Sequence, residues 1–361
     1  MAINFDERID RNQYPTLKWS EEFLAEYFGN KAAIPMSVAD MDLKPPPTVI
    51  QQLRKRVEHG IYGYEFRSDS FFNGFEAWYR QRHGWRIDRE HVEACPSILN
   101  AISILINQHS SEGDGVVLQP PVFFEFRDVI RSSNRRIVKN PLNLTDGQYR
   151  VDFDDLEDKA SESGNRILIL CNPHNPVGRV WTRSELNRIA EICERHGVFV
   201  IADEIHGDFS FPPNQYVPYL SVSEAAAGHG AACISSGKTF NISGIVDAMT
   251  IIPDDDHRER FHDFAHRYKI NRVNVFATAA MEGAYTDGAE WLDKLLVYVR
   301  GNVDLVREHL RANSPGVSLI EPEGTFLVWL DFRDLGMGAK ELERFLSQEA
   351  QIAVAPGYWF G

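Results

Sequence analysis

The chain has 361 residues, of which 25% are charged and 43% hydrophobic, as in a globular protein with one large and one smaller domain. The net charge of −14 argues against nucleic acid as the main partner, because phosphate binding needs clustered lysine and arginine. No apolar run approaches the roughly 20 residues of a membrane span, and the first residues do not form a secretory signal. The four cysteines lack metal-type spacing, so we expect reduced thiols and a cytoplasmic protein.

The first part of the chain contains mixed residues and then helical patterns. Residues 1–45 end in a proline run and are interpreted as an N-terminal arm that forms part of the small domain. Apolar residues at helical spacing predict helices over 48–59, which Gly60 would end, and over 70–83. A third apolar segment, headed by Ser97, extends to Ile106.

Apolar strands and helices then alternate. Short apolar runs predict strands at 116–118, 167–170, 198–202, 233–234 and 248–252. The sequence Thr-Arg-Ser-Glu at 182–185 is a capping box, which predicts a helix that ends at Gly197. Buried strands separated by helices indicate a three-layer α/β/α architecture with a mostly parallel sheet.

We therefore expect a large domain over residues 46–277. A long helical stretch beyond Thr278, a strand over 325–331 and a helix over 340–348 follow it. This second part predicts a small α+β domain over 278–361.

Three polar residues follow predicted strands. Lys238 comes just after the run that ends at Ile234, Asp203 follows 198–202, and Asn175 lies in a turn after 167–170. Each has an ordinary alternative, since a lysine is usually solvated, an aspartate often caps a helix, and asparagine favours turns. Their shared position matters more, because ligands of open α/β sheets bind at the carboxyl ends of strands.

An amine, an acid and an amide at such an edge meet the needs of pyridoxal phosphate. Lys238 could hold the aldehyde as a Schiff base and later move protons. Asp203 could keep the pyridine nitrogen protonated. Asn175 could donate to the phenolate oxygen, and His206 could point to the same side of the ring. A phosphate would find hydroxyls at Ser235 and at Ser97, the head of a helix.

Longer motifs resemble the fold-type I pyridoxal-phosphate enzymes of the aspartate aminotransferase superfamily. The pattern is most similar to the MalY/PatB-type cystathionine β-lyases. The likeness extends from about residue 35 to the end. It is carried by Val-Ala-Asp-Met-Asp at 38–42, Ile-Tyr-Gly-Tyr at 61–64, Asn-Pro-His-Asn-Pro-Val-Gly at 172–178, Ala-Asp-Glu-Ile-His at 202–206 and Ser-Ser-Gly-Lys-Thr-Phe-Asn at 235–241.

This resemblance implies a carbon–sulfur β-lyase that splits cystathionine or related cysteine conjugates into pyruvate, ammonia and a thiol. An aminotransferase using the same residues stays an alternative, and so does a regulatory protein that binds a protein partner. The resemblance assigns Lys238, Asp203, Asn175, with His206 nearby, and Ser235 to the cofactor. It adds a phosphate loop formed by the backbone amides of Ser97, Ile98 and Leu99.

Further expectations come from the resemblance alone. Phe123 stands where the family places a ring-stacking tyrosine, so it can stack but lacks the hydroxyl. Tyr64 matches a tyrosine that reaches the phosphate of the neighbouring subunit, which implies a homodimer with shared active sites. The backbone at Ala39 is expected to line the substrate pocket. The arginine that grips the substrate carboxylate is expected beyond Gly361, in a segment that the sequence does not include.

Overall fold

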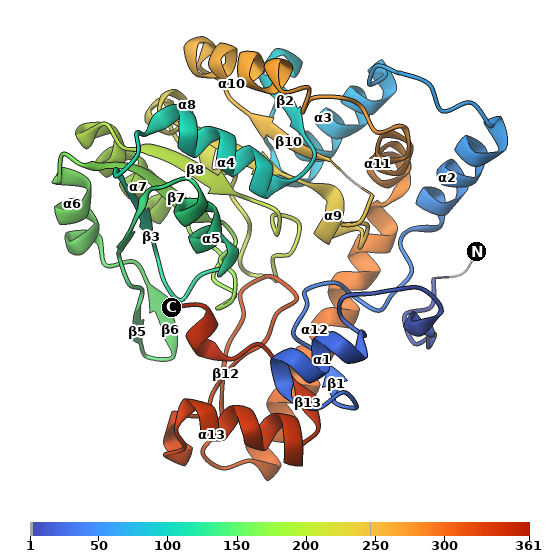
Figure 1. Ribbon diagram of the computed structural model, residues 1–361, viewed down its shortest axis with the longest axis vertical. Helices are drawn as coiled ribbons and strands as arrows, with labels where there is room; N and C mark the ends of the chain where they lie inside the picture. The colour runs from blue at the N-terminus through green and yellow to red at the C-terminus, as the bar shows by residue number, and fades with distance from the viewer. Residues whose placement is uncertain (1–2, 246) are drawn as a thin grey trace.

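A seven-stranded sheet forms the centre of the computed structural model, which describes residues 3–245 and 247–361 (Figure 1). The strand order is β2-β10-β9-β8-β7-β3-β4, and β10 alone runs antiparallel to its neighbours. The strands of this sheet are β2 (Val92–Cys95), β3 (Gly115–Leu118), β4 (Arg136–Lys139), β7 (Asn165–Cys171), β8 (Phe199–Asp203), β9 (Gly230–Ile234) and β10 (Ala248–Ile251). The other strands in the described residues form two-stranded sheets; they are β1 (Ile34–Pro35), β5 (Asn143–Thr145), β6 (Gln148–Arg150), β11 (Ser318–Ile320), β12 (Trp329–Asp331) and β13 (Ile352–Ala353).

Helices cover both faces of this sheet. The α-helices in the described residues are α1 (Glu21–Phe28), α2 (Pro47–His59), α3 (Asp69–His83), α4 (Ile98–His109), α5 (Glu125–Ser132), α6 (Phe153–Ser161), α7 (Arg183–His196), α8 (Glu224–Gly228), α9 (Ser236–Thr239), α10 (Asp255–Arg267), α11 (Val275–Asp287), α12 (Ala289–Asn313) and α13 (Ala339–Arg344). Of these, α1 and α13 lie below the sheet and do not cover it (Figure 1). No helix in the described ranges combines the length and apolar character needed to cross a bilayer.

The core around the central sheet divides into two clusters because side chains alternate along each strand, and a third, smaller cluster lies in the lower part of the molecule. In β7, Leu168 and Leu170 belong to the cluster shared with α3, α7 and α11, whereas Ile167 and Ile169 belong to the one shared with α4, α5 and α10. This arrangement confirms the three-layer α/β fold. Four cysteines are buried free thiols, also as expected.

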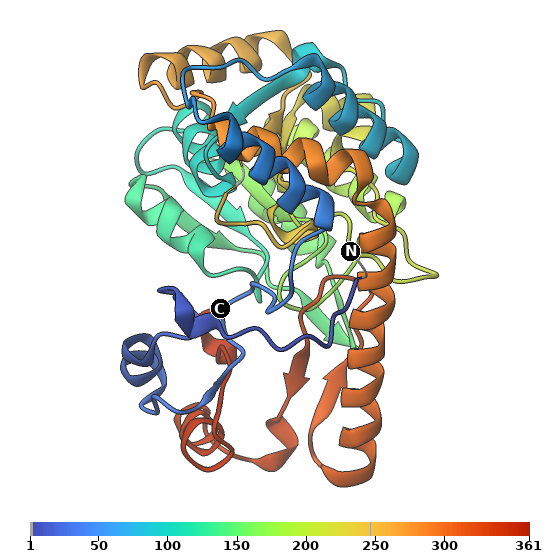
Figure 2. The ribbon, with the colours of Figure 1, turned by 90° about the vertical axis from the view of Figure 1, so that its right-hand side faces the viewer.

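Segments from the first and last parts of the chain lie together below the sheet. Figure 2 shows α12 running down from the sheet-containing part to a lower part, where blue N-terminal and red C-terminal segments lie together. There β1 pairs in parallel with β13, and β11 pairs with β12. The N-terminal segment thus returns from the lower part to the sheet through residues 36–46.

Most predicted elements are present. The helices expected over 48–59 and 70–83 are α2 and α3, and Gly60 ends α2 in the left-handed conformation. Both hydrogen bonds of the capping box at Thr182 and Glu185 form. The expected strand over 325–331 is wrong for residues 325–328, because Thr325 has a φ of 66° and its amide donates to the carbonyl of Phe209 instead of to a sheet.

Candidate active site

Lys238 lies in a short helix directly beyond the central sheet. β9 ends at Ile234, Ser235 caps α9, and Lys238 is the third residue of α9. The lysine is half-buried, not a solvated surface residue, and its Nζ donates a hydrogen bond to the carbonyl of Ala39. Burial lowers the pKa of this amine, while three nearby carboxylates raise it, those of Asp40, Asp203 and Glu125.

Asp203 is the last residue of β8 and pairs with Cys233 on β9. Only 5% of its surface is exposed, and its Oδ1 accepts a hydrogen bond of 3.1 Å from the amide of Ile205. It caps a turn rather than a helix. Burial raises the pKa of this carboxyl to about 6, although the Ile205 amide and the Lys238 charge act in the opposite direction. Asp203 is therefore a buried acid with little compensation from the protein.

Asn175 lies at the end of the next strand, in the turn after β7. The residue is buried, and its backbone N–H donates to Cys171 Sγ at 3.3 Å. Its carbonyl accepts from the amide of Phe123 at 3.1 Å, which brings the Phe123 loop beside this turn. Phe123 is half-buried, with Phe126 at 5.4 Å between ring centroids. The structure therefore brings the turns after β7, β8 and β9 and the Phe123 loop to one edge of the sheet.

His206 completes this group. The side chain is buried, and its ring centroid lies 5.5 Å from that of Phe326. Its Nδ1 has no hydrogen-bond partner in the part of the chain that the structure describes. Burial, with the Lys238 charge adding to it, lowers the pKa of His206 to about 3, so the imidazole is neutral. A neutral ring with an unpartnered nitrogen is available to a ligand.

Two serines head helices near this edge. Ser97 caps α4 by accepting from the amide of Asn100 at 3.2 Å, so the amides of Ile98 and Leu99 are left for another acceptor at the first turn. Ser235 is buried, accepts from Gly237 at 3.2 Å and donates to the carbonyl of Asp247. Its hydroxyl must rotate away from that carbonyl before it can donate to a ligand.

Tyr64 is not buried with the others. It lies on the loop between α2 and α3 with 95% of its surface exposed, and Arg272 stands 5.5 Å from its ring centroid. Ile61 and Phe66 on the same loop are also largely exposed.

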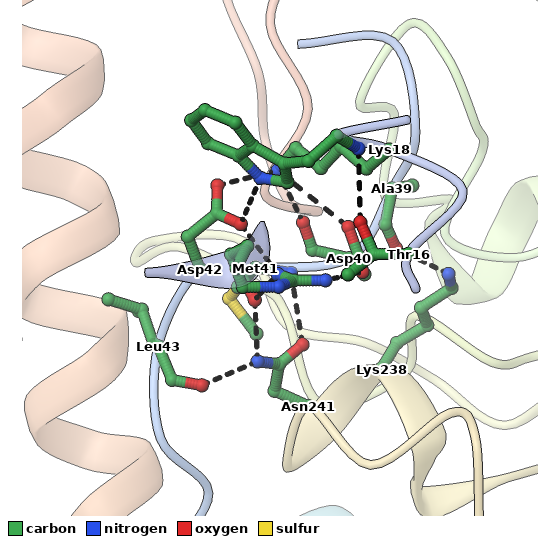
Figure 3. A network of polar contacts seen from close by, with 11 residues as sticks. Thr16, Lys18, Ala39, Asp40, Met41, Asp42, Leu43, Lys238 and Asn241 are labelled. Carbon is green, nitrogen blue, oxygen red and sulfur yellow. Dashed lines mark hydrogen bonds and ion pairs between the residues drawn. The ribbon is translucent and has the colours of Figure 1, made fainter. Parts of the chain in front are cut away.

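Sequence reasoning missed four contributors to this edge. Glu125 and Asp40 carry charges that act on Lys238, and Phe326 packs against His206. Asn241 binds the backbone of Met41 (Figure 3). Asp40 and Asn241 lie within the motifs at 38–42 and 235–241, but the sequence assigned them no function. No sequence motif marks Glu125 or Phe326 as part of the site.

The comparisons with known proteins agree with this geometry. The family model of class I and II aminotransferases matches residues 31–361, and the chain belongs to that family. Among its relatives, cystathionine β-lyase PatB of Bacillus subtilis is 36% identical over 359 residues, covering 99% of this chain and 92% of PatB. Protein MalY of Escherichia coli is 32% identical, covering 99% of this chain and 91% of MalY. The crystal structure of cystalysin from Treponema denticola, which contains pyridoxal 5′-phosphate, superposes with a TM-score of 0.95 at 31% identity, covering 100% of this chain and 92% of that one.

Proposed function

We propose that the protein is a pyridoxal-phosphate-dependent carbon–sulfur β-lyase that acts on cystathionine or related cysteine S-conjugates. The observation that carries this proposal is that Lys238, Asp203 and Asn175 lie at or just beyond the carboxyl ends of three adjacent strands, at one edge of the sheet. Relatives named as cystathionine β-lyases, from Bacillus subtilis and Corynebacterium glutamicum, cover nearly the whole chain.

The residues fit this cofactor. A pyridinium N–H would supply the buried carboxylate of Asp203 with the positive partner that it lacks. The unpartnered Nδ1 of His206 and the buried Asn175 are suited to the ring's polar substituents. The free amides of Ile98 and Leu99 at the start of α4 suit the phosphate. Phe123 has a ring to stack but no hydroxyl to act as an acid.

When bound, the cofactor supplies an electron sink for the electron pair left on the substrate Cα. Lys238 accepts the Cα proton, a role helped by burial, because a lowered pKa keeps more of the amine neutral at neutral pH. Asp203 would hold a negative charge for the ring nitrogen. The Cα electron pair would then form a Cα–Cβ double bond as the Cβ–S bond breaks, the thiolate would leave with the electrons of that broken bond, and hydrolysis of the remaining three-carbon fragment would give pyruvate and ammonia.

We also propose that two copies of the chain complete each site. The loop bearing Tyr64 presents four large hydrophobic residues of which more than half of each is exposed in the single subunit, at Ile61, Tyr62, Tyr64 and Phe66. Exposed clusters of this kind mark interaction surfaces. Tyr64 then contributes its hydroxyl to the phosphate site of the neighbouring subunit.

The test is incubation of the cofactor-loaded protein with L-cystathionine, with pyruvate and homocysteine measured together. We expect the two products in equal amounts, and neither from a Lys238→Ala variant. Cofactor binding without either product would refute the proposal. An aminotransferase would instead convert its bound cofactor to the amine form with an amino acid that lacks a leaving group.

A further inference from the structure

Residues 39–43 form a strap that crosses in front of Lys238 (Figure 3). At its first residue, the carbonyl of Ala39 accepts the hydrogen bond from Lys238 Nζ. Neither end of the strap belongs to a helix or strand, so regular secondary structure does not hold it in place. Side-chain hydrogen bonds and ion pairs must therefore fix the strap relative to the Lys238 amine.

Asn241 holds the strap from the Lys238 side. Its Oδ1 accepts from the amide of Met41 at 2.9 Å, and its Nδ2 donates to the carbonyls of Met41 and Leu43, each at 2.7 Å. A single side chain thus satisfies three backbone groups of an irregular segment 200 residues away in sequence. Asn241 has a φ of 54°, and its backbone N–H donates to the carbonyl of Lys238 at 3.4 Å. Lys238 and the strap are therefore both fixed to the same turn.

The N-terminal segment holds the other side of the strap. Arg11 pairs with Asp40 at 2.7 Å and with Asp42, while Lys18 Nζ donates to the carbonyl of Asp40 at 2.9 Å and to Asp42 at 2.8 Å. Trp19 Nε1 also donates to Asp42, at 3.0 Å. The side chain of Lys18 is only 8% exposed, an unusual state for a lysine that indicates a built contact.

We propose that Asn241 is a positioning residue for Lys238: by fixing the strap, it keeps the Ala39 carbonyl where it receives the amine of Lys238 whenever that amine is not covalently engaged. Arg11 and Lys18 close the same clamp from the N-terminal side. One N–H held by a carbonyl limits the orientations of the amine, so its lone pair is already directed when a proton must be taken. This inference rests on the proposed function only in treating Lys238 as the reactive amine.

The first experiment measures the strap itself in cofactor-free protein. Asn241→Gly removes the side chain and tolerates the positive φ. Asn134→Gly is the matched control, because Asn134 also has a positive φ, of 58°, and is exposed on a turn outside the site. Hydrogen exchange of the peptide covering residues 36–46 should become faster in Asn241→Gly and stay unchanged in Asn134→Gly, with circular dichroism confirming that both variants are folded. Unchanged exchange in folded Asn241→Gly would overturn the inference.

The second experiment separates positioning from substrate binding. In cofactor-loaded Asn241→Gly we expect kcat for pyruvate release to fall roughly 10- to 100-fold with KM nearly unchanged, since a misplaced reacting group loses about this much. Faster exchange with wild-type kcat would refute the positioning role and leave the proposed function intact. If the wild-type enzyme releases no pyruvate, the proposed function fails. The positioning role of Asn241 is then still decided by hydrogen exchange of the strap and by acylation of Lys238, since both are measured in cofactor-free protein.

A third measurement tests the N-terminal side of the clamp. Lys18→Met keeps the apolar stem but removes one of the two cations that neutralise Asp40 and Asp42. The strap should exchange faster, and the extra negative charge should raise the pH midpoint at which Lys238 reacts with an acylating reagent in cofactor-free protein. Three other titratable groups are coupled to Lys238, and the substitution leaves them unchanged; they are Asp203, Glu125 and His206. A wild-type exchange rate in Lys18→Met would remove the N-terminal segment from the clamp.

Discussion

Replacing Asp203 by asparagine should stabilise the cofactor-free protein while destroying its activity. Burial raises the pKa of this carboxyl from 3.8 to about 6, and only the Ile205 amide and the Lys238 charge offset it. The folded protein therefore binds this proton more tightly than the unfolded chain does. Ionisation of Asp203, as the pH rises through about 6, works against the fold. Asparagine has nearly the same shape, keeps an oxygen for the Ile205 amide and carries no charge.

The size of the effect follows from the pKa difference. A rise from 3.8 to about 6 is about two units, and each unit corresponds to about 1.4 kcal/mol. The ionised Asp203 therefore lowers the free energy of unfolding by about 3 kcal/mol. The Asp203→Asn variant should exceed wild type by about 2–3 kcal/mol near pH 8, and the difference should vanish only below about pH 3, where the carboxyl is protonated in both the folded and the unfolded state.

Urea unfolding of the two cofactor-free proteins across this pH range measures the difference. Glu204, whose pKa burial raises to about 7, titrates in both proteins, and its contribution cancels except for the smaller part of its pKa shift that the Asp203 charge causes. Addition of pyridoxal phosphate should stabilise wild type more than the variant, because only the aspartate gains a charged partner. The reasoning is refuted if the variant is less stable near pH 8, or if the difference does not change with pH.

Three other substitutions test the remaining parts of the site. Lys238→Ala should lower pyruvate release by roughly 10²- to 10⁴-fold or more and abolish the absorption band of covalently bound cofactor; a normal band in this variant contradicts the assignment. Tyr64→Phe should weaken cofactor binding roughly tenfold through loss of one hydrogen bond to a charged group, with the dimer intact by sedimentation; equal affinity would remove Tyr64 from the phosphate site. Asp208→Asn should lower the free energy of unfolding by about 3–5 kcal/mol, because this buried carboxylate accepts from His83 at 2.9 Å and Thr239 at 2.8 Å; unfolding by urea measures it, and a loss under about 1 kcal/mol would show that the carboxylate contributes little.

The sequence predicted the sheet and its functional edge because both depend on local patterns. Continuous apolar runs identify buried strands, and a polar residue placed directly after such a run must emerge at the strand's carboxyl end. Lys238, Asp203 and Asn175 were accessible to this reasoning for that reason. The capping box at Thr182 and the glycine after α2 were predictable in the same way, since each acts over three or four residues.

The strap and its clamp could not be predicted in this way. Asn241 and Met41 are 200 residues apart, and the contact joins a side chain to backbone groups that any residue would supply. The burial of Lys18 was equally unpredictable, because no neighbouring residue in the sequence indicates that this lysine contacts Asp40 and Asp42. Thr325 was assigned to a strand from its apolar neighbours, but its positive φ is set by contact with the distant Phe209. Long-range contacts decide all three.

The adjacent acids Asp203 and Glu204 show how structure separates a functional group from a structural one. Both are buried. Glu204 accepts hydrogen bonds from Asn172 at 2.8 Å, Tyr216 at 2.7 Å and the Tyr219 amide at 2.8 Å, so it ties the end of β7 to the 216–219 segment. Within the described residues, the carboxylate of Asp203 accepts a single hydrogen bond. A buried polar group is normally fully satisfied by the protein; where one is not, the missing partner must come from elsewhere. The deficit at Asp203, beside the unpartnered Nδ1 of His206, is therefore what the proposed cofactor site requires, whereas the hydrogen bonds of Glu204 are all made within the protein.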